Sequence, residues 1–475
     1  MFHTYFKSFY SINRMLVVKC PIFGFTFELR PKSRASSIMT STGLRTIRPE
    51  DVRAFAYDPV EPLALEQARS IVNDVKARGE TAVREHAVRL GDLPSTSAPL
   101  VYSRDDMKTA FESLSIGEQK LLERTKQRIE AFAIAQRASI QSFSRAIPGG
   151  QAGQDVSPMQ VAGCYAPGGR YPLPSSVLMT ALTARVAGVS TVIVASPRPA
   201  VATLAAAYIS NADLLLAVGG AQAVAALAYG LDGTGISACD IIVGPGNKYS
   251  SISQSGLFPA AHRIVRWVTA AKSLVYGKCA IDMLAGPSEC LVVADASAVV
   301  HAATIAADLL AQAEHDTAAV PILVTDSTAL LDAVNAAIID QLTTLPTADT
   351  AAVSVAKGFA VLCPTLDSCV DVANVLAAEH VEIMTADSQA VADRIQHYGA
   401  AEVLGDYGVG PNHVLPTGGT ARYTGGLSVH TFLRIRTWMR IDDGPLSQEA
   451  VADAVQLARV EGLEGHARAA ERRLL

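Results

Sequence analysis

The stretch ADLLAQAEHD, residues 307 to 316, puts three kinds of polar chemistry on one face of a predicted helix. Asp308, Gln312 and His315 follow one another at spacings of four and then three residues, which aligns a carboxylate, an amide and an imidazole along one stripe. An amphipathic helix normally keeps one kind of chemistry on each face. A solvated surface helix can show the same spacing, so the stripe needs support from other parts of the chain.

Five further polar residues stand out in three other stretches of the chain. Glu379 and His380 come just before a predicted strand in LAAEHVEIMT, and Asp406 and His413 lie in the glycine-rich GDYGVGPNHVLPTGG. His466 lies in EGLEGHARAAERR. A single histidine is more often a hydrogen-bonded structural residue than a ligand. Asp406 and His413, however, stand in a loop with no apolar pattern, and such positioned polar residues are where chemistry tends to occur.

Two glycine turns follow short apolar strands. LLLAVGGAQAVAAL reads as strand, Gly219-Gly220 and helix, and DIIVGPGN as strand followed by Gly244-Pro-Gly246-Asn247. Helix N-termini behind glycine turns at the carboxyl ends of parallel strands bind nucleotides and other anions. Neither turn is a GxGxxG, and close packing of helix on strand would also favour glycine there.

The elements that must position these groups alternate between strand and helix. Residues 65–92 and 115–136 have helical periodicity, which predicts an N-terminal helical arm. After Pro148-Gly149-Gly150, β-branched runs alternate with glycine turns and alanine-rich helices, the signature of βαβ units and parallel sheets. The pattern recurs after residue 288, so we expect an α/β fold with two Rossmann-like parallel-sheet domains and a small C-terminal helical docking element.

Changes in composition and in hydrophobic periodicity divide the chain into five expected segments. The expected segments are a non-core extension at 1–40, a helical arm at 41–150, a first α/β domain at 151–275, a second at 276–404, and a C-terminal loop and helical tail at 405–475.

The composition bounds the class of ligand. The 475-residue chain has a formal net charge of -5, which leaves no basic field for nucleic acid or for an anionic membrane, so a small metabolite is the expected partner. Apolar runs are interrupted before the length of about 20 residues that a membrane span needs, and no transmembrane helix is predicted. Seven widely spaced cysteines without a CxxC pair fit a reducing compartment.

Two segments do not fit the globular pattern. The first forty residues carry Lys7, Arg14 and Lys19 with no acidic residue before Glu28, which suits either an organelle-import segment or an upstream start preceding a natural one at Met39. Residues 250–267 (SSISQSGLFPAAHRIVRW) lack strand or helix periodicity and follow Asn247 closely. They are interpreted as a retained intron read in frame, with a surface loop as the alternative.

Taken together, the motifs resemble the histidinol dehydrogenase family, whose members use zinc and NAD. The resemblance rests on GCYAPGGRYPLPSSVLM, AVGGAQAVAALAYG, GPGNKY, VTAAK, IDMLAGPSE, DLLAQAEHD, AAEH, GDYGVGPNHVLPTGG and EGLEGH, which occur in the family's order from about residue 43 onward. It implies that one Zn²⁺ is held by Gln312, His315, Asp406 and His466. These four also belong to the implied substrate site, to which the resemblance adds Ser288, His413 and Glu461.

The resemblance also implies catalytic and cofactor roles. Glu379 and His380 would be the acid–base pair, and Tyr165, Gln222 and Asn247 would line the NAD site. The implied reaction is a four-electron oxidation of L-histidinol to L-histidine through the aldehyde, in the last step of histidine biosynthesis. The implied assembly is an intertwined cytoplasmic homodimer, with the C-terminal helices as the dimerisation element.

Three alternatives remain at this stage. Motifs in the tail also resemble a side branch that oxidises other small polar alcohols such as sulfonated diols. A zinc hydrolase, with Glu314 or Glu379 activating water, would need the metal but would leave the glycine turns unexplained. An inactive binding protein would follow if residues 250–267 blocked the cofactor groove.

Overall fold

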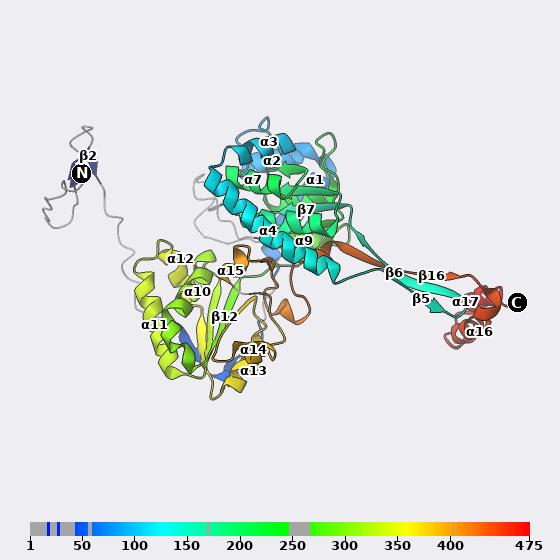
Figure 1. The fold of residues 1–475 in the computed structure, drawn as a ribbon. Helices are drawn as coiled ribbons and strands as arrows, with labels where there is room; N and C mark the ends of the chain where they lie inside the picture. Colours follow the sequence, from blue (N-terminus) through cyan, green and yellow to red (C-terminus); the bar gives the residue numbers. More distant parts are fainter. Residues whose placement is uncertain are drawn as a thin grey trace. The chain divides into compact units, whose positions relative to one another are not determined.

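The computed structural model describes two short N-terminal strands and most of the chain after them. The described ranges are 17–19, 26–28, 43–55, 59–168, 172–246, 267–400 and 402–475. The chain divides into two compact units, Met1–Thr42 and Gly43–Leu475. In the first unit, β1 (Val17–Lys19) pairs antiparallel with β2 (Thr26–Glu28). The elements that follow belong to the second unit (Figure 1).

The first large sheet has six strands in the order β11-β10-β7-β8-β9-β4, all parallel except β4. Its strands are β4 (Val101–Tyr102), β7 (Val161–Tyr165), β8 (Thr191–Ala195), β9 (Leu214–Leu216), β10 (Ile241–Val243) and β11 (Ala280–Ile281). Both faces of this sheet are buried. In β8, Val192 and Val194 join the core on one face and Ile193 and Ala195 join the core on the other, as the two-residue period of a strand requires.

Helices cover both faces of the first sheet. One face packs against α1 (Pro62–Arg78), α2 (Glu80–Arg89), α8 (Gly220–Tyr229) and α9 (Trp267–Val275). The other packs against α3 (Arg104–Glu112), α4 (Ile116–Ala138), α5 (Pro174–Val177), the π-helical turn η2 (Leu178–Leu182), α6 (Thr183–Ala187) and α7 (Val201–Ile209). Helices from the N-terminal region, residues 41–150, thus complete the helical layers of this domain.

The second sheet has five parallel strands in the order β15-β12-β13-β14-β3. They are β3 (Arg45–Ile47), β12 (Glu289–Ala294), β13 (Val320–Thr325), β14 (Phe359–Leu362) and β15 (His380–Met384), with η1 (Pro49–Asp51) after β3. One face packs against η3 (Ala296–His301), α10 (Ala302–His315), α11 (Thr328–Leu342) and α12 (Ala348–Val355). The other face packs against α13 (Leu366–Leu376) and α14 (Ser388–Ala392).

One segment within the described part of the chain, Ala296–His315, is long and apolar enough to cross a membrane by length and composition. It comprises η3 and α10, and the side chains of Ile305, Leu309 and Leu310 are buried in the core beneath the second sheet. Core helices of globular proteins pass the same test, so this packing accounts for the apolar character of α10.

A three-stranded antiparallel ribbon extends from the first α/β domain (Figure 1). Its strands are β5 (Phe143–Ile147), β6 (Gly150–Pro158) and β16 (Leu433–Ile441), and it ends at α16 (Gly444–Val460) and α17 (Glu464–Glu471). Gly149 in the β5–β6 turn has φ +71°, and a Cβ there would lie 2.5 Å from the carbonyl oxygen of Asp443. Glycine is therefore required where α16 meets the turn. The ribbon and its two terminal helices are called the arm below.

The α/β class and the parallel sheets expected from the sequence are confirmed. The long strand β16 lies in the segment expected to be a loop and helical tail, and α15 (Val403–Asp406), η4 (Thr420–Arg422) and η5 (Val429–Phe432) lie in the same region. Trp267, placed at the end of the aperiodic segment, is instead the first residue of α9, where its indole N–H donates to Oε1 of Gln67 at 2.9 Å. The rest of that segment, 250–266, lies outside the described residues.

Candidate active site and metal centre

The predicted acid–base pair, Glu379 and His380, lies at the amino end of β15, beside the amino end of the neighbouring parallel strand β12. Glu289 and His380 are the first residues of β12 and β15, and Cys290 is in register with His380. The N–H of Glu379 donates to Oε2 of Glu289 at 3.3 Å, and the N–H of Glu289 donates to Oε2 of Glu379 at 3.2 Å. Because the two strands exchange these hydrogen bonds, both carboxyl groups are fixed by the sheet.

Burial dominates the electrostatics of this pair. Glu379 is 6% exposed and His380 is 2% exposed. Burial, together with the nearby carboxyl groups of Glu289, Glu402 and Asp406, raises the pKa of Glu379 well above its ordinary value, and a hydrogen bond from Ser288 opposes this only in part. A carboxyl group in such surroundings holds a proton more tightly and, once ionised, is a stronger base.

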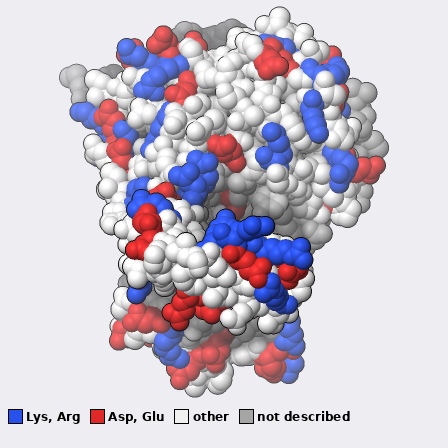
Figure 2. All heavy atoms as spheres, turned by 90° about the vertical axis from the view of Figure 1, so that its right-hand side faces the viewer, with Lys and Arg blue, Asp and Glu red and all other residues white. Residues whose placement is uncertain are grey.

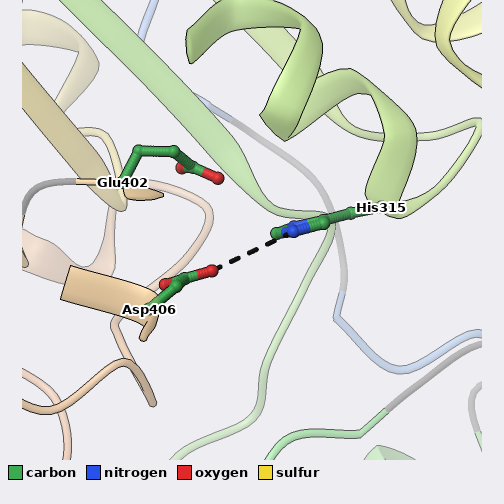
Figure 3. A group of neighbouring side chains, drawn as sticks. All are labelled: His315, Glu402 and Asp406. Carbon is green, nitrogen blue, oxygen red and sulfur yellow. Dashed lines mark ion pairs between the residues drawn. The ribbon is translucent and has the colours of Figure 1, made fainter. Parts of the chain in front are cut away.

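Three side chains converge on one point beside His380. Oδ2 of Asp406 lies 4.0 Å from Nε2 of His315, and one ligand atom from each of His315, Glu402 and Asp406 lies within 4.8 Å of the other two (Figure 3). His315 is the last residue of α10, Asp406 is the last of α15, and Glu402 immediately precedes α15. An imidazole nitrogen and two carboxylate oxygens at this separation can hold a divalent cation such as Zn²⁺.

His380 contacts the same cluster. Its Nε2 lies 3.4 Å from Oε2 of Glu402 and 3.9 Å from Oδ1 of Asp406. Burial and the surrounding carboxyl groups raise the pKa of Glu402 to about 9, and burial raises the pKa of Asp406 to about 7. The acid–base pair and the possible metal ligands therefore form one electrostatic unit.

Gln312 is an independent indication that this group of side chains binds a cation. Its side chain is completely buried, and neither Oε1 nor Nε2 has a hydrogen-bond partner. Gln312 lies three residues before His315 on α10, so the two side chains share a face of the helix. Buried polar atoms are rarely left unpaired, and an amide oxygen at this position fits a ligand to a cation bound by His315 and Asp406.

The loop after α15 holds His413 in a defined tautomer. Nδ1 of His413 lies 3.0 Å from the carbonyl oxygen of Asp406, which can only accept, so Nδ1 carries the proton. Burial lowers the pKa of His413 to about 4, and the imidazole is neutral near pH 7 with Nε2 as an acceptor. Asn412 anchors the loop by donating from Nδ2 to the carbonyl oxygen of Met179 in η2 at 2.7 Å.

The two predicted cofactor residues that the structure describes lie at the carboxyl edge of the first sheet. Tyr165 ends β7, and its hydroxyl accepts a hydrogen bond from the N–H of Gly220 at 3.3 Å. Gln222 lies in the first turn of α8 and is 1% exposed. Asn247 lies outside the described residues.

The second glycine turn is held by a buried ion pair. Nζ of Lys272 on α9 contacts Oδ1 of Asp282 and donates to the carbonyl oxygen of Gly244 at 3.0 Å, while the N–H of Gly244 donates to Oδ2 of Asp282 at 2.7 Å. Gly244 has φ +119°, and a Cβ there would lie 2.0 Å from the carbonyl oxygen of Tyr165. This position thus requires glycine, and the ion pair fixes both polar groups of its backbone.

The structure brings together seven of the predicted residues and separates two from them. Ser288, Gln312, His315, Glu379, His380, Asp406 and His413 lie at or beside the cluster. Glu461 and His466 lie at the end of α16 and on α17, at the far end of the arm from α10 and α15, where both side chains are exposed (Figure 1). Within one chain the arm does not complete the site.

Glu289 and Glu402 are two residues of the site that no sequence pattern had predicted. Glu289 begins a strand that was recognised, but its role depends on pairing with the neighbouring strand β15, which lies far away in the sequence. Glu402 precedes a four-residue helix in a stretch without periodicity. A local signal did exist, because Glu402 is four residues before Asp406 and shares its unusual glycine-rich surroundings.

The raised pKa of Glu402 predicts how the stability of the metal-free protein depends on pH. From pH 4.5, the ordinary value, to about 9, the folded chain keeps a proton on Glu402 that the unfolded chain has released, so this group makes the folded state less stable as pH rises. In Glu402→Gln this contribution disappears, and the free energy of unfolding should fall less steeply with pH. Urea unfolding of chelator-treated protein across this range measures the slope.

The matched control for that prediction is Glu449→Gln, which removes an exposed carboxyl group on α16. It should reproduce the slope of the unchanged protein. Parallel curves for Glu402→Gln and the unchanged protein would show that Glu402 is ionised in the folded, metal-free state.

Comparisons with known proteins identify the family of the chain. A model of the histidinol dehydrogenase family matches residues 60–261 and 265–474. A histidinol dehydrogenase of Thermus thermophilus is 40% identical over 432 residues, covering 89% of this chain and 96% of that protein. One of Acinetobacter baylyi is 40% identical over 434 residues, covering 88% and 95%.

Among solved structures, histidinol dehydrogenase from Elizabethkingia anophelis superposes with a TM-score of 0.80 at 26% identity, covering 90% of this chain and 98% of that one. The family match spans both α/β domains and the arm, and it includes every described residue of the cluster. The chain therefore belongs to the histidinol dehydrogenase family.

Proposed function

We propose that this chain oxidises L-histidinol to L-histidine with NAD, in two successive two-electron steps through the aldehyde. One observation carries the proposal beyond family membership. The acid–base pair Glu379 and His380 lies directly against the cluster of His315, Glu402 and Asp406, so a proton acceptor and a candidate metal site face the same space. An amino alcohol bound there would present its hydroxyl group to His380.

The residues present fit a bound zinc ion. His315 and Asp406 offer an imidazole nitrogen and a carboxylate oxygen, Gln312 offers an unpaired buried amide oxygen, and we propose His466 of the partner subunit as the fourth ligand. Zn²⁺, when bound, supplies a Lewis acid that binds the polar groups of the amino alcohol and offsets the negative charge of the site. The buried carboxyl groups and the orphaned amide of Gln312 support a cation at this point.

The chain's own groups can carry the proton transfers. In the first step, Nε2 of His380 takes the hydroxyl proton while hydride leaves the carbinol carbon for NAD, which gives the aldehyde and NADH. Glu402, 3.4 Å from Nε2, would stabilise the resulting imidazolium in its ionised form, which a bound cation favours. In the second step, Glu379 takes a proton from water as it adds to the aldehyde, and loss of hydride to a second NAD gives the acid.

Ser288 and His413 would orient the substrate, together with Glu461 of the partner subunit. The Ser288 hydroxyl donates to Glu379, and the unprotonated Nε2 of His413 can accept a hydrogen bond from a substrate N–H.

The face shown in Figure 2 has basic and acidic side chains interspersed, with no broad basic area, which suits a small-molecule substrate better than nucleic acid.

The compartment belongs to the proposal as well. The six cysteines in the described part of the chain are free, buried thiols, which supports a cytoplasmic location. Import into an organelle through residues 1–40 is the alternative that the N-terminal composition offers.

The test of this function combines activity with metal content. Purified protein should reduce two molecules of NAD for each L-histidinol, seen as NADH absorbance. His315→Ala should lose most of its zinc and its activity, because a tetrahedral site binds weakly after one imidazole is removed. His301→Ala, an exposed histidine on η3, is the control and should keep both. A folded His315→Ala variant with full zinc content would contradict the assignment.

The two members of the acid–base pair should have separable roles. His380→Asn should lose alcohol oxidation by a factor of about 10² to 10⁴, the range typical of a removed general base. Glu379→Gln should mainly impair conversion of the aldehyde to the acid. Supplying either the alcohol or the aldehyde to each variant measures the two half-reactions separately, and equal losses in both would argue against the division of labour.

The exposed arm predicts a site shared by two chains. Val460, Met439 and Leu446 on the arm are 84%, 69% and 68% exposed, and apolar surface of this kind favours docking onto a second copy, which would also bring His466 to a partner's cluster. His315→Ala and His466→Ala should each be inactive as homodimers. A mixed dimer then has one site with both lesions and one with neither, so activity should return in proportion to mixed dimer formed.

Native mass spectrometry of the mixture supplies the control for that experiment, because it measures how much mixed dimer is present. Confirmed mixed dimers without any recovered activity would place His466 in the site of its own chain or outside the site.

A further inference from the structure

The first glycine turn is capped by a carboxyl group from the N-terminal helical region. Asp92, in the turn after α2, accepts on one oxygen, Oδ2, from the N–H of Gly219 at 2.9 Å and from Nε2 of Gln222 at 3.0 Å. The next N–H, that of Gly220, donates to the hydroxyl of Tyr165 at 3.3 Å. The backbone N–H groups of Gly219 and Gly220, the first two at the start of α8, therefore have acceptors within the protein.

This capping changes what the turn can bind. A free helix N-terminus binds phosphate oxygens through its unpaired N–H groups and the positive end of the helix dipole. At α8, a carboxyl oxygen of Asp92 already takes the hydrogen bond of the Gly219 N–H, so a phosphate oxygen could not accept from that group without displacing Asp92. The hydrogen bonds of this turn thus leave the N–H groups of Gly219 and Gly220 unavailable to an anion.

The same contact sets the orientation of the Gln222 amide. The oxygen Oδ2 of Asp92 accepts from the Gly219 N–H, so the group of Gln222 that faces it is the NH₂, which leaves Oε1 directed elsewhere. Gln222 is 1% exposed, and Oε1 has no hydrogen-bond partner. A buried acceptor without a donor is costly, and a ligand that brings a donor removes that cost.

Gly220 leaves one side of this acceptor free of side-chain atoms. Its φ of +64° favours glycine, and a Cβ at this position would lie 3.1 Å from Oε1 of Gln222. Any larger residue would crowd the oxygen. The turn is therefore built with a bare backbone beside an oriented, unpaired carbonyl oxygen.

We propose that Asp92 is a positioning residue for the cofactor: it holds the Gln222 amide so that Oε1 accepts a hydrogen bond from a neutral N–H or O–H group of the dinucleotide. The inference rests on the proposed use of NAD. The dinucleotide has three such sources, namely the nicotinamide carboxamide, the adenine amino group and the ribose hydroxyls. The pyrophosphate must lie away from this turn.

The test is a double-mutant cycle on NADH binding. Fluorescence titration of the purified full-length protein measures the dissociation constant of each variant. Asp92→Ala and Gln222→Met should each weaken binding about tenfold, the cost of one hydrogen bond. Because Asp92 acts through Gln222, the double variant should also be about tenfold weaker. An additive loss of about a hundredfold would overturn the inference, since Asp92 would then act independently of Gln222.

Conservative and control variants keep the result interpretable. Asp92→Asn retains an oxygen for the same two N–H groups and should bind within about threefold of the unchanged protein, even if Asp92→Ala fails to fold. A tenfold loss in a folded Asp92→Asn variant would count against positioning by hydrogen bonds. Asp105→Ala, an exposed position on α3, should change nothing.

Two cofactor analogues identify the donor. The deamino analogue lacks the adenine amino group, and the acetylpyridine analogue lacks the carboxamide NH₂. The analogue without the donor should bind the unchanged protein and Gln222→Met equally, and a retained difference with both identifies a ribose hydroxyl. Failure of the unchanged protein to bind NADH would instead refute the proposed cofactor, and this inference with it.

Discussion

Burying several carboxyl groups around one histidine is the constraint on which the rest of the site depends. In a medium of low polarity, like charges at these separations cannot all be ionised without a cation or bound protons. The fold satisfies part of the cluster itself, through the hydrogen bonds that Glu289 and Glu379 exchange and through the N–H of Gly418, which donates to Glu289 at 2.8 Å. It leaves Oε2 of Glu402, which lies 3.4 Å from Nε2 of His380, without a hydrogen bond, and it leaves the amide of Gln312 without a hydrogen-bond partner. These unpaired groups are the part of the site that only a ligand can satisfy.

The position of the cluster follows from the direction of the strands. In most open α/β sheets the ligand binds at the carboxyl ends of the strands, as the glycine turns of the first sheet suggest here. The second sheet uses the opposite edge. The amino ends of β12 and β15 expose backbone N–H groups, and these groups suit carboxylates, as the contacts of Glu289 and Glu379 show. The loop from Asn412 to Gly418 joins the two domains, because it contacts η2 at one end and β12 at the other.

How far the sequence could predict this arrangement depends on the range of each signal. The helical period alone predicted that Gln312 and His315 share one face of a helix. The short β-branched runs that alternate with glycine turns and helices predicted the parallel sheets. Glu402 and Asp92 escaped notice because their partners lie on elements distant in the sequence, which no local pattern encodes. Strand β16 is a different case. Its sequence LRIRTWMRI alternates in a way that is typical of a strand, but the glycine- and proline-rich surroundings favoured a loop.

In the arm, too, some groups find their contacts within one chain and others do not. β16 pairs with β6 along its whole length, from Leu433 with Pro158 to Ile441 with Gly150, so the ribbon is well defined without further contacts. Yet the helices at its end expose an imidazole, a carboxyl group and large apolar side chains, while the site on the main body has a buried amide without a partner. This division is what the proposed dimer requires, because the exposed groups of one chain would meet the unpaired groups of another. In the proposed dimer, two-fold symmetry would satisfy both surfaces at once, because each arm would supply what the other body lacks.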